Sequence, residues 1–232
     1  MTNGEMDEAL RTRELPPLPA DQLKQIAAAI TADLKPVRPL APAGAYLAGF
    51  ACIFLAIFVV GCYLVGQQGW HALTSVQKLC VFAPLAASVG LLVCSIVPQM
   101  TPAAKYARST AVASASLFAL LLVMMAAIFE PAREATFVRT GLACFILGMK
   151  FAIPSAILFA VLLRRGAGLS SVLTGATAGG LSGLVGLAIL EVQCPNLNLY
   201  HILAWHVSVT LVCVLVGMVL SGVTFRRWTS NN

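Results

Sequence analysis

Long apolar stretches alternate with short polar connections along most of this chain. Between Ala45 and Thr224, six stretches reach about 20 predominantly apolar residues, the length that a helix needs to cross a bilayer. We therefore expect six transmembrane helices at Ala45–Gly66, Leu79–Val97, Ser109–Phe129, Gly141–Leu163, Leu169–Leu190 and Tyr200–Thr224. The longest connection, Pro98–Arg108, has 11 residues, so no folded domain fits between two of these helices.

The stretches also define the domain organisation. A transmembrane domain at residues 45–228 follows a more polar tail at 1–44 and precedes a short tail at 229–232. The composition fits a membrane protein, because 59% hydrophobic residues, 10% charged residues and a mean hydropathy of +0.88 lie outside the range of ordinary soluble domains. Strands of a membrane β-barrel would alternate in polarity, whereas these stretches are continuously apolar. We therefore predict an all-α membrane protein.

The Lys and Arg residues that flank the helices indicate their orientation. With a cytoplasmic N-terminus, the inner side carries Lys35, Arg38, Lys105, Arg108, Arg164, Arg165, Arg226 and Arg227. The outer side then carries only Lys78, Arg133 and Arg139. The positive-inside rule favours this arrangement, which places both termini in the cytoplasm. The same excess accounts for the net charge of +6 without a nucleic-acid partner.

The N-terminal tail contains a short amphipathic pattern over about residues 21–34. Asp21 is a suitable N-cap, and an apolar stripe recurs at intervals of three and four through Leu23, Ile26, Ile30 and Leu34. An isolated helix of this length is marginal in water, so the stripe needs a surface to cover it. Two surfaces are open: the membrane or the protein's own loops, and the groove of a cytoplasmic partner.

Small residues line one side of the fifth predicted helix. Gly175, Gly179 and Gly183 recur every four residues, a pattern that lets two helix backbones approach closely. We interpret this stripe as a packing surface in preference to a ligand channel. The sequence does not say whether the neighbouring helix belongs to the same chain.

Lys150 is a charge deep within a predicted span. An intramembrane charge is by default a functional candidate. Lys150 either extends to the membrane surface, approaches Glu191 at the outer end of the fifth helix, or takes part in a transport path. The last reading supports the main alternative for this protein, a small membrane transporter or channel.

Two of the seven cysteines stand out by position. Cys144 lies near the outer end of the fourth predicted helix, and Cys194 lies in the outer connection before the sixth. Both would face an oxidising compartment, where a disulfide between them is feasible. Cys62 and Cys80 fall near the same face and compete as pairing partners. No Cys-x-x-Cys motif is present, so neither a thioredoxin-like centre nor a zinc knuckle is indicated.

Histidine and glutamate accompany these cysteines near one membrane surface. His201, His206 and Glu191 could supply ligands to a soft divalent metal, while the alternative is interfacial anchoring together with Trp205. Residues five apart lie about 140° apart around an α-helix. We therefore expect the two histidines not to face the same point.

The chain lacks recognised catalytic motifs. There is no Gly-rich phosphate loop, His-Glu-x-x-His metal motif or Gly-x-Ser-x-Gly elbow. Haem ligation by two opposed histidines is also disfavoured, because both His201 and His206 lie on one helix. We predict neither an enzyme nor a cofactor.

Several weak motifs, in order, resemble those of one family. They are the tail segment Ala32–Leu40, the turn Leu163–Ala167, the Gly-rich helix that follows it, the Cys194–Pro195 loop and the Trp205–His206 pair. Together they are similar to the NrsF family of six-helix bacterial inner-membrane anti-sigma factors. The resemblance extends over roughly residues 32–228.

This resemblance implies a function and a set of residues. The protein would bind an extracytoplasmic-function sigma factor at the inner membrane and release it under stress. The tail would be the contact, through Leu23, Ile26, Ile30, Leu34 and Arg38. Family membership also implies a cysteine pair in sensing, which by position corresponds to Cys144 and Cys194.

Overall fold

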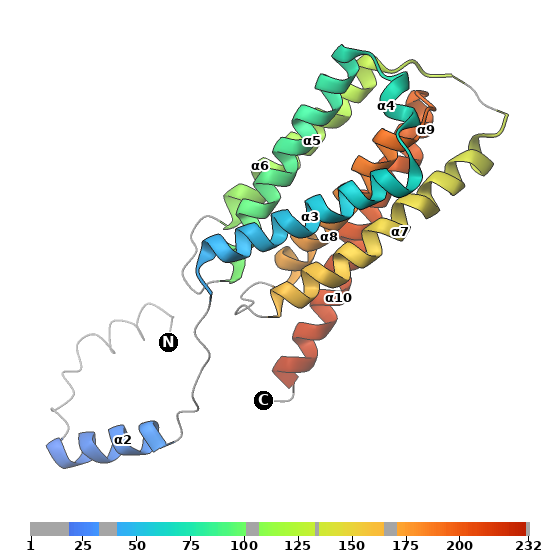
Figure 1. Ribbon diagram of the computed structural model, residues 1–232. Helices are drawn as coiled ribbons and strands as arrows, with labels where there is room; N and C mark the ends of the chain where they lie inside the picture. Colours follow the sequence, from blue (N-terminus) through green and yellow to red (C-terminus); the bar gives the residue numbers. More distant parts are fainter. Residues whose placement is uncertain (1–18, 33–40, 101–106, 133–134, 165–170, 231–232) are drawn as a thin grey trace, which may run out of the picture. The chain divides into compact units, whose positions relative to one another are not determined.

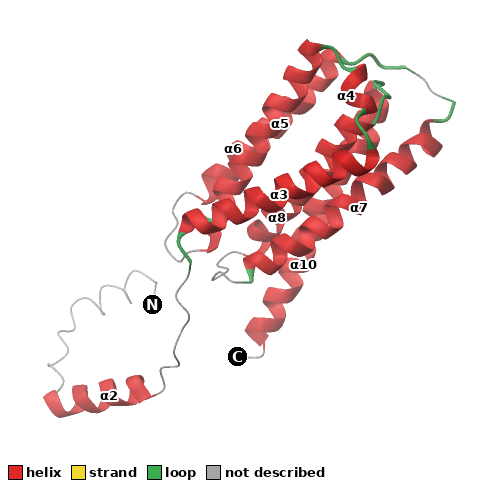
Figure 2. Cartoon of the chain, in the orientation of Figure 1, coloured by secondary structure: helices red, strands yellow, loops and turns green. Residues whose placement is uncertain are grey.

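A computed structural model describes residues 19–32, 41–100, 107–132, 135–164 and 171–230 of the protein. Within these ranges the regular structure is entirely helical, as Figure 2 shows, so the all-α prediction is confirmed. The chain divides into two units, Met1–Pro39 and Leu40–Asn232. The helices are α2 (Ala20–Ala32), α3 (Ala43–Val65), α4 (Gln68–Ala72), α5 (Ser75–Ile96), η1 (Pro98–Met100), α6 (Ala107–Ile128), α7 (Phe137–Leu163), α8 (Ser171–Gln193), α9 (Leu199–His201), η2 (Ile202–His206) and α10 (Val207–Ser230).

Five helical segments of the second unit are long and apolar enough to cross a membrane. They are Ala43–Val65, Ser75–Met100, Phe137–Leu163, Val172–Gln193 and Leu199–Gly222. The chain is thus a multi-pass membrane protein. The remaining predicted crossing falls on α6, where the apolar part Val112–Ile128 is shorter. A sixth crossing therefore stays a prediction.

Helix α8 lies at the centre of the second unit. It packs against α10, α7, α5 and α3, and in Figure 1 it runs behind α3 and α7. Within its span 72% of the residues are buried, compared with 22% to 39% in the other four. Leucine and isoleucine on several sides of α8 are fully covered, as expected for a helix that is apolar all round.

The helices around α8 present apolar side chains outward. Exposed residues of this kind include Val59, Leu64, Leu79, Val123, Ile157 and Leu215. Hydrocarbon lipid chains accept such a surface, whereas water would penalise it. The outward faces therefore agree with placement in a bilayer.

Helices α5 and α6 form an antiparallel pair that runs side by side in Figure 1. Thr74 caps α5 in a reciprocal capping box: the Gln77 backbone N–H donates to Thr74 Oγ1, and the Thr74 N–H donates to Gln77 Oε1. The Gln77 side chain also donates to the Ile128 carbonyl at 3.4 Å, which joins the start of α5 to the end of α6. This cap explains why α5 begins at Ser75, four residues before the predicted apolar stretch.

The glycine stripe of α8 meets α10 of the same chain. A Cβ atom on Gly179 would lie 2.2 Å from the Cys213 carbonyl oxygen, and one on Gly183 would lie 2.5 Å from the Thr210 Cα. Gly175 lies equally close to the Gly217 carbonyl. Any side chain at these three positions would separate the two backbones, so glycine sets the distance between α8 and α10.

The first unit contains α2. Its residues Leu23 and Ile26 are 52% and 47% exposed, so half of each apolar side chain is uncovered. The side chain of Ile30 and all of Leu34 and Arg38 lie outside the described residues. The helix covers most of the predicted range 21–34, beginning one residue earlier, at Ala20.

Candidate functional site

Four metal-ligating side chains meet at the end of the bundle where α8 ends and α10 begins. We call Cys144, Cys194, His201 and His206 the Cys/His cluster. Their ligand atoms all lie within 4.8 Å of one another. Cys144 comes from α7, Cys194 follows α8, and the histidines lie on α9 and η2. Three of the four side chains are buried, and Cys144 is half-buried.

A π-helical turn brings the two histidines together. The segment Ile202–His206 is π-helical, with more residues per turn than an α-helix. At roughly 4.4 residues per turn, a separation of five residues rotates a side chain only about 50° beyond a full turn. The ring centroids of His201 and His206 accordingly lie 5.2 Å apart, with the rings edge to face. The expectation that they face different points was wrong, because it assumed α-helical geometry.

The two sulfurs of the cluster share a hydrogen bond. Cys144 Sγ lies 3.6 Å from Cys194 Sγ, and Cys194 Sγ lies 3.6 Å from His201 Nε2. Both cysteines are free thiols, at a distance well beyond the 2.05 Å of a disulfide. The hydrogen bond with Cys144, together with burial, raises the pKa of the Cys194 thiol. Cys194 is therefore protonated at neutral pH when nothing binds its sulfur.

Glu191 orients one of the histidines. Its Oε1 lies 2.9 Å from His206 Nδ1, and both side chains are almost fully buried, at 3% and 1% exposure. His206 Nε2 is also buried, and within the described residues it has no hydrogen-bond partner. Glu191 thus lies outside the group of four ligand atoms and contacts the cluster through His206.

Two glycines that sequence reasoning missed make room around the cluster. A Cβ on Gly69 of α4 would lie 2.5 Å from the Cys194 carbonyl oxygen, so α4 packs directly on the Cys194 backbone. A Cβ on Gly141 would collide with the Trp205 indole, which also packs on Phe137 with ring centroids 5.7 Å apart. Trp205 therefore packs onto α7 near Cys144. Neither glycine belongs to a repeated pattern that could have pointed to it.

Asn198 links the cluster loop to the connection after α6. Its Nδ2 donates to the Ala132 carbonyl at 2.6 Å, and its Oδ1 accepts from the backbone N–H groups of Ala132 and Tyr200. Leu199 N–H donates in addition to the Glu130 carbonyl. These bonds hold the loop that carries Cys194 against the end of the α5–α6 pair.

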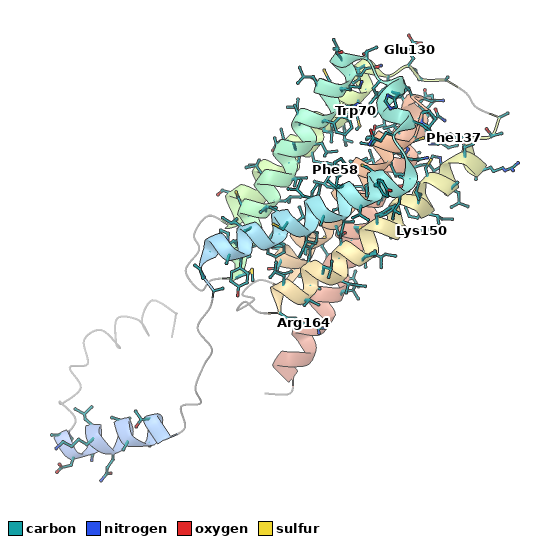
Figure 3. The ribbon with its side chains drawn as sticks, viewed as in Figure 1. Phe58, Trp70, Glu130, Phe137, Lys150 and Arg164 are labelled. Carbon is teal, nitrogen blue, oxygen red and sulfur yellow. The ribbon has the colours of Figure 1, made fainter. Side chains whose placement is uncertain are left out.

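Other predicted residues lie away from this site. Lys150 is exposed on α7 (Figure 3), and the partner of Glu191 is His206. Cys62 and Cys80 are free and do not belong to the cluster. The structure thus brings Cys144, Cys194, His201, His206 and Glu191 into one connected group and leaves Lys150 out of it.

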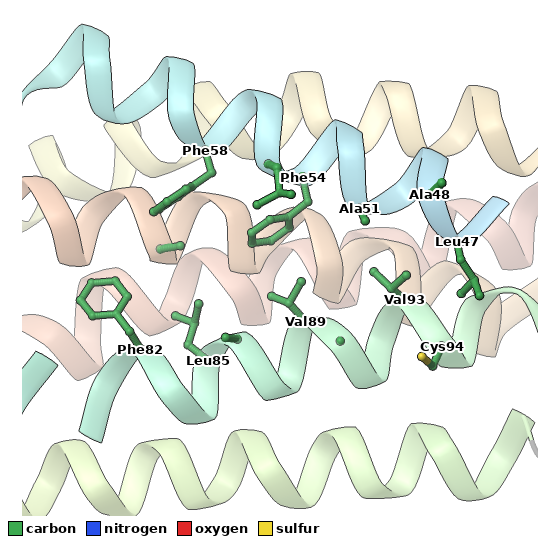
Figure 4. Close-up of a pocket in the computed structure, with 14 residues that line it drawn as sticks. Leu47, Ala48, Ala51, Phe54, Phe58, Phe82, Leu85, Val89, Val93 and Cys94 are labelled. Carbon is green, nitrogen blue, oxygen red and sulfur yellow. The ribbon is translucent and has the colours of Figure 1, made fainter. Parts of the chain in front are cut away.

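An apolar groove lies between α3 and α5. Its volume is about 650 Å³, and Figure 4 shows apolar side chains such as Phe54, Phe58, Phe82 and Leu85 lining it. Such a lining offers shape but almost no hydrogen bonds. Buried thiol, imidazole and carboxylate groups meet instead at the Cys/His cluster and Glu191.

Comparison with known proteins places this geometry in a family context. The model of the NrsF family, described as negative regulator of sigma F, matches residues 26–228. The match covers nearly the whole chain. No curated protein and no solved structure matches the chain.

Proposed function

The chain belongs to the NrsF family and is thus a negative regulator of a sigma factor; on this premise we propose that it holds an extracytoplasmic-function sigma factor at the bacterial inner membrane and releases it under stress. The family is one of regulators, not of enzymes. The observation that carries the proposal is the family match over residues 26–228, which includes both part of α2 and the membrane bundle.

The sigma factor would bind the N-terminal tail. Leu23 and Ile26 leave an apolar surface uncovered on α2, and this helix belongs to a unit separate from the bundle. An amphipathic helix of this kind can lie in an apolar groove of a partner. We assign the contact to the stripe Leu23, Ile26, Ile30 and Leu34, with Arg38 adding a charge beside it. Binding there would block the sigma factor's access to RNA polymerase.

The signal would be received at Cys144 and Cys194. Their sulfurs are 3.6 Å apart, so a small movement brings them to bonding distance. Oxidation would join them as the thiols give two electrons and two protons to a thiol oxidant. Metal capture at the same sulfurs would change the pair without oxidation. Either event acts on α7 and on the loop after α8 at once.

A packed route leads from this pair to α3, the first helix of the bundle. Helix α3, which follows the tail in the chain, packs on α7 and α8. Its Gly61 approaches Ile189, two residues before Glu191, so closely that a Cβ would lie 2.5 Å from the Ile189 Cδ1. A shift of α7 or α8 at the cluster would therefore displace the side chains of α3 that pack on them. With six crossings and cytoplasmic termini, the cluster lies on the outer side and the tail on the inner side.

Co-purification tests the proposed contact. The full-length chain, solubilised in mild detergent from its native host, should recover a sigma factor, and a chain lacking residues 1–34 should not. Mass spectrometry identifies the recovered protein. Failure of the full-length chain to retain any sigma factor would refute the proposal, and equal recovery with both chains would move the contact from the tail to the inner loops.

Substitution of the cysteines tests the proposed sensing. Cys144→Ser and Cys194→Ser should change the stress-dependent release of the sigma factor, measured with a reporter gene under its control, while the protein still inserts in the membrane. Cys62→Ser is the matched control, because Cys62 is a buried cysteine outside the cluster. Unchanged release in both cluster variants would remove the sensing role.

A further inference from the structure

The Cys/His cluster has the composition and the spacing of a closed metal site. Two thiols and two imidazoles converge from α7, the loop after α8, α9 and η2. Four-coordinate sites of two cysteines and two histidines are typical of structural zinc. We infer that the cluster binds a resident Zn²⁺ ion through all four side chains. This inference deepens the proposed function, because it names the occupant of the sensing site.

The distances between ligand atoms support a tetrahedral ion. With Zn–S near 2.3 Å and Zn–N near 2.0 to 2.1 Å, tetrahedral angles separate two sulfurs by about 3.8 Å and a sulfur from a nitrogen by about 3.6 Å. The Cys144 and Cys194 sulfurs are 3.6 Å apart, and Cys194 Sγ is 3.6 Å from His201 Nε2. The sulfur–sulfur distance is thus about 0.2 Å below the tetrahedral value, and the sulfur–nitrogen distance agrees with it. All four ligand atoms lie within 4.8 Å of one another, so the donors that are farthest apart need to approach by about 1 to 1.5 Å when the ion binds.

His206 is prepared to be a ligand. Glu191 Oε1 lies 2.9 Å from its Nδ1, and a carboxylate accepts a hydrogen bond only from a protonated nitrogen. In the neutral imidazole the proton is then on Nδ1, which leaves the lone pair of Nε2 free for a metal. Nε2 is buried and lacks a partner within the described residues. A metal ion would satisfy this otherwise costly buried acceptor.

Charge balance favours a divalent ion at this depth. Burial of an isolated charge is expensive, and Zn²⁺ with two thiolates and two neutral imidazoles has a net charge of zero. Binding therefore adds no charge to the buried group beyond the Glu191 carboxylate on His206. Two sulfur and two nitrogen donors in tetrahedral arrangement favour zinc over the oxygen-preferring Mg²⁺ and Ca²⁺. Because all four positions belong to the protein, the ion has a structural role and joins α7 to the α8–α10 pair.

Metal analysis of the purified protein tests this inference without reference to the sigma factor. The full chain, carrying an affinity tag free of histidine and purified in mild detergent, should contain one zinc ion per chain by plasma mass spectrometry. X-ray absorption at the zinc edge should show two sulfur neighbours at about 2.3 Å and two nitrogen neighbours at about 2.0 to 2.1 Å. A zinc-free protein after loading and dialysis, or a shell of oxygen and nitrogen alone, would overturn the inference.

Paired substitutions locate the ion. Cys194→Ser and His206→Gln should each lose most of the zinc, whereas Cys62→Ser and His71→Gln should keep it, since Cys62 and His71 lie outside the cluster. Zinc retained by both cluster variants would contradict the assignment. Cobalt exchange into the unaltered chain gives a readout that does not depend on variant folding, because two thiolate ligands produce a strong charge-transfer absorption and its absence would count against the site.

The same preparations separate this inference from the proposed function. Zinc bound as described, in a chain that retains no sigma factor, would leave the metal site standing and remove the sigma-binding proposal. A chain that retains its sigma factor but holds no zinc would do the reverse. The two results are measured independently on one sample.

Discussion

Two adjacent glycines of α8 offer a stringent test of the packing against α10. A Cβ on Gly179 would lie 2.2 Å from the Cys213 carbonyl oxygen and 2.8 Å from its carbon, and both are backbone atoms that cannot turn aside. A Cβ on Gly180 would meet only the ends of the Leu92 and Val214 side chains, at 3.5 Å, an ordinary contact. Substitution of each glycine by alanine therefore adds one methyl group to a blocked position or to an open one.

The expected difference can be worked out from these contacts. Alanine gains about 0.8 to 1.0 kcal/mol over glycine in a helix interior, and this gain is common to both variants. Overpacking of a well-filled interior costs about 1 to 3 kcal/mol. Since the propensity cancels in the comparison, Gly179→Ala should be less stable than Gly180→Ala by about 1 to 3 kcal/mol. The free energy of unfolding of Gly180→Ala itself should equal or exceed that of the unaltered protein.

Unfolding in detergent measures this difference. The protein in mild detergent is titrated with sodium dodecyl sulfate, and the loss of helical circular dichroism gives the free energy of unfolding for each variant. The unaltered chain is the reference. Equal stabilities for Gly179→Ala and Gly180→Ala would refute the close backbone approach of α8 and α10, as would a larger loss at Gly180.

Four further results are expected. Asn198→Ala should lower the free energy of unfolding by about 0.5 to 1.5 kcal/mol per hydrogen bond lost, because it removes the bonds to the Ala132 backbone N–H and carbonyl. The same detergent titration measures this loss, and Asn198→Asp, which keeps the acceptor oxygen, should lose less. Glu191→Ala should weaken zinc binding by about 10- to 100-fold, whereas Glu191→Gln, which retains an oxygen for the His206 Nδ1–H, should weaken it less. Competition with a coloured chelator measures the zinc affinity of each variant. Equal losses in the two variants would contradict the orienting role of Glu191. Zinc binding should release protons, and the zinc affinity should increase as pH rises from about 6 to 8. The reason is that zinc binds thiolates, whereas the raised pKa of Cys194 keeps that thiol protonated over this range. An affinity independent of pH would argue against thiolate ligands. Leu23→Glu should abolish recovery of the sigma factor in the co-purification. Gln25→Glu, which adds the same charge beside the stripe, should preserve it. Identical recovery with the two variants would count against a docking helix.

The helices could be predicted from the sequence because their signal is long and local. A run of about 20 apolar residues identifies a spanning helix with little reference to its neighbours. The differences arise where polar residues extend a helix. Glu191 and Gln193 lie inside α8, beyond the predicted end at Leu190, because Glu191 is buried against His206 and needs no solvent. The extension of α8 depends on His206, which lies 15 residues after Glu191 in the chain. A hydropathy pattern contains no information about such a partner.

The site was less accessible to sequence reasoning, and η2 shows why. The residue types Cys144, Cys194, His201 and His206 marked the right part of the chain, but their grouping requires the π-turn at Ile202–His206. A π-turn inserts one residue relative to α-helical spacing and has no dependable sequence signature. Gly69 and Gly141 could not be identified from the sequence for the same reason, because they are required by contacts with Cys194 and Trp205 that only the tertiary fold brings about.

The distribution of the ligands indicates which helix a signal at the cluster would move. Three of the four ligands lie on the segment from Cys194 to His206, next to the α8–α10 contact whose spacing the glycines fix. The fourth, Cys144, comes from α7 alone. One turn further along α7, Gly148 meets Gly186 of α8 so closely that a Cβ on Gly186 would lie 2.7 Å from the Gly148 carbonyl oxygen. This contact, together with the packing of Trp205 on Phe137 and Gly141, holds α7 to the bundle on both sides of Cys144. On the proposed function, a change at the cluster would act on α7 through Cys144 alone. Helix α3, which packs on both α7 and α8 and follows the tail in the chain, is the element placed to respond.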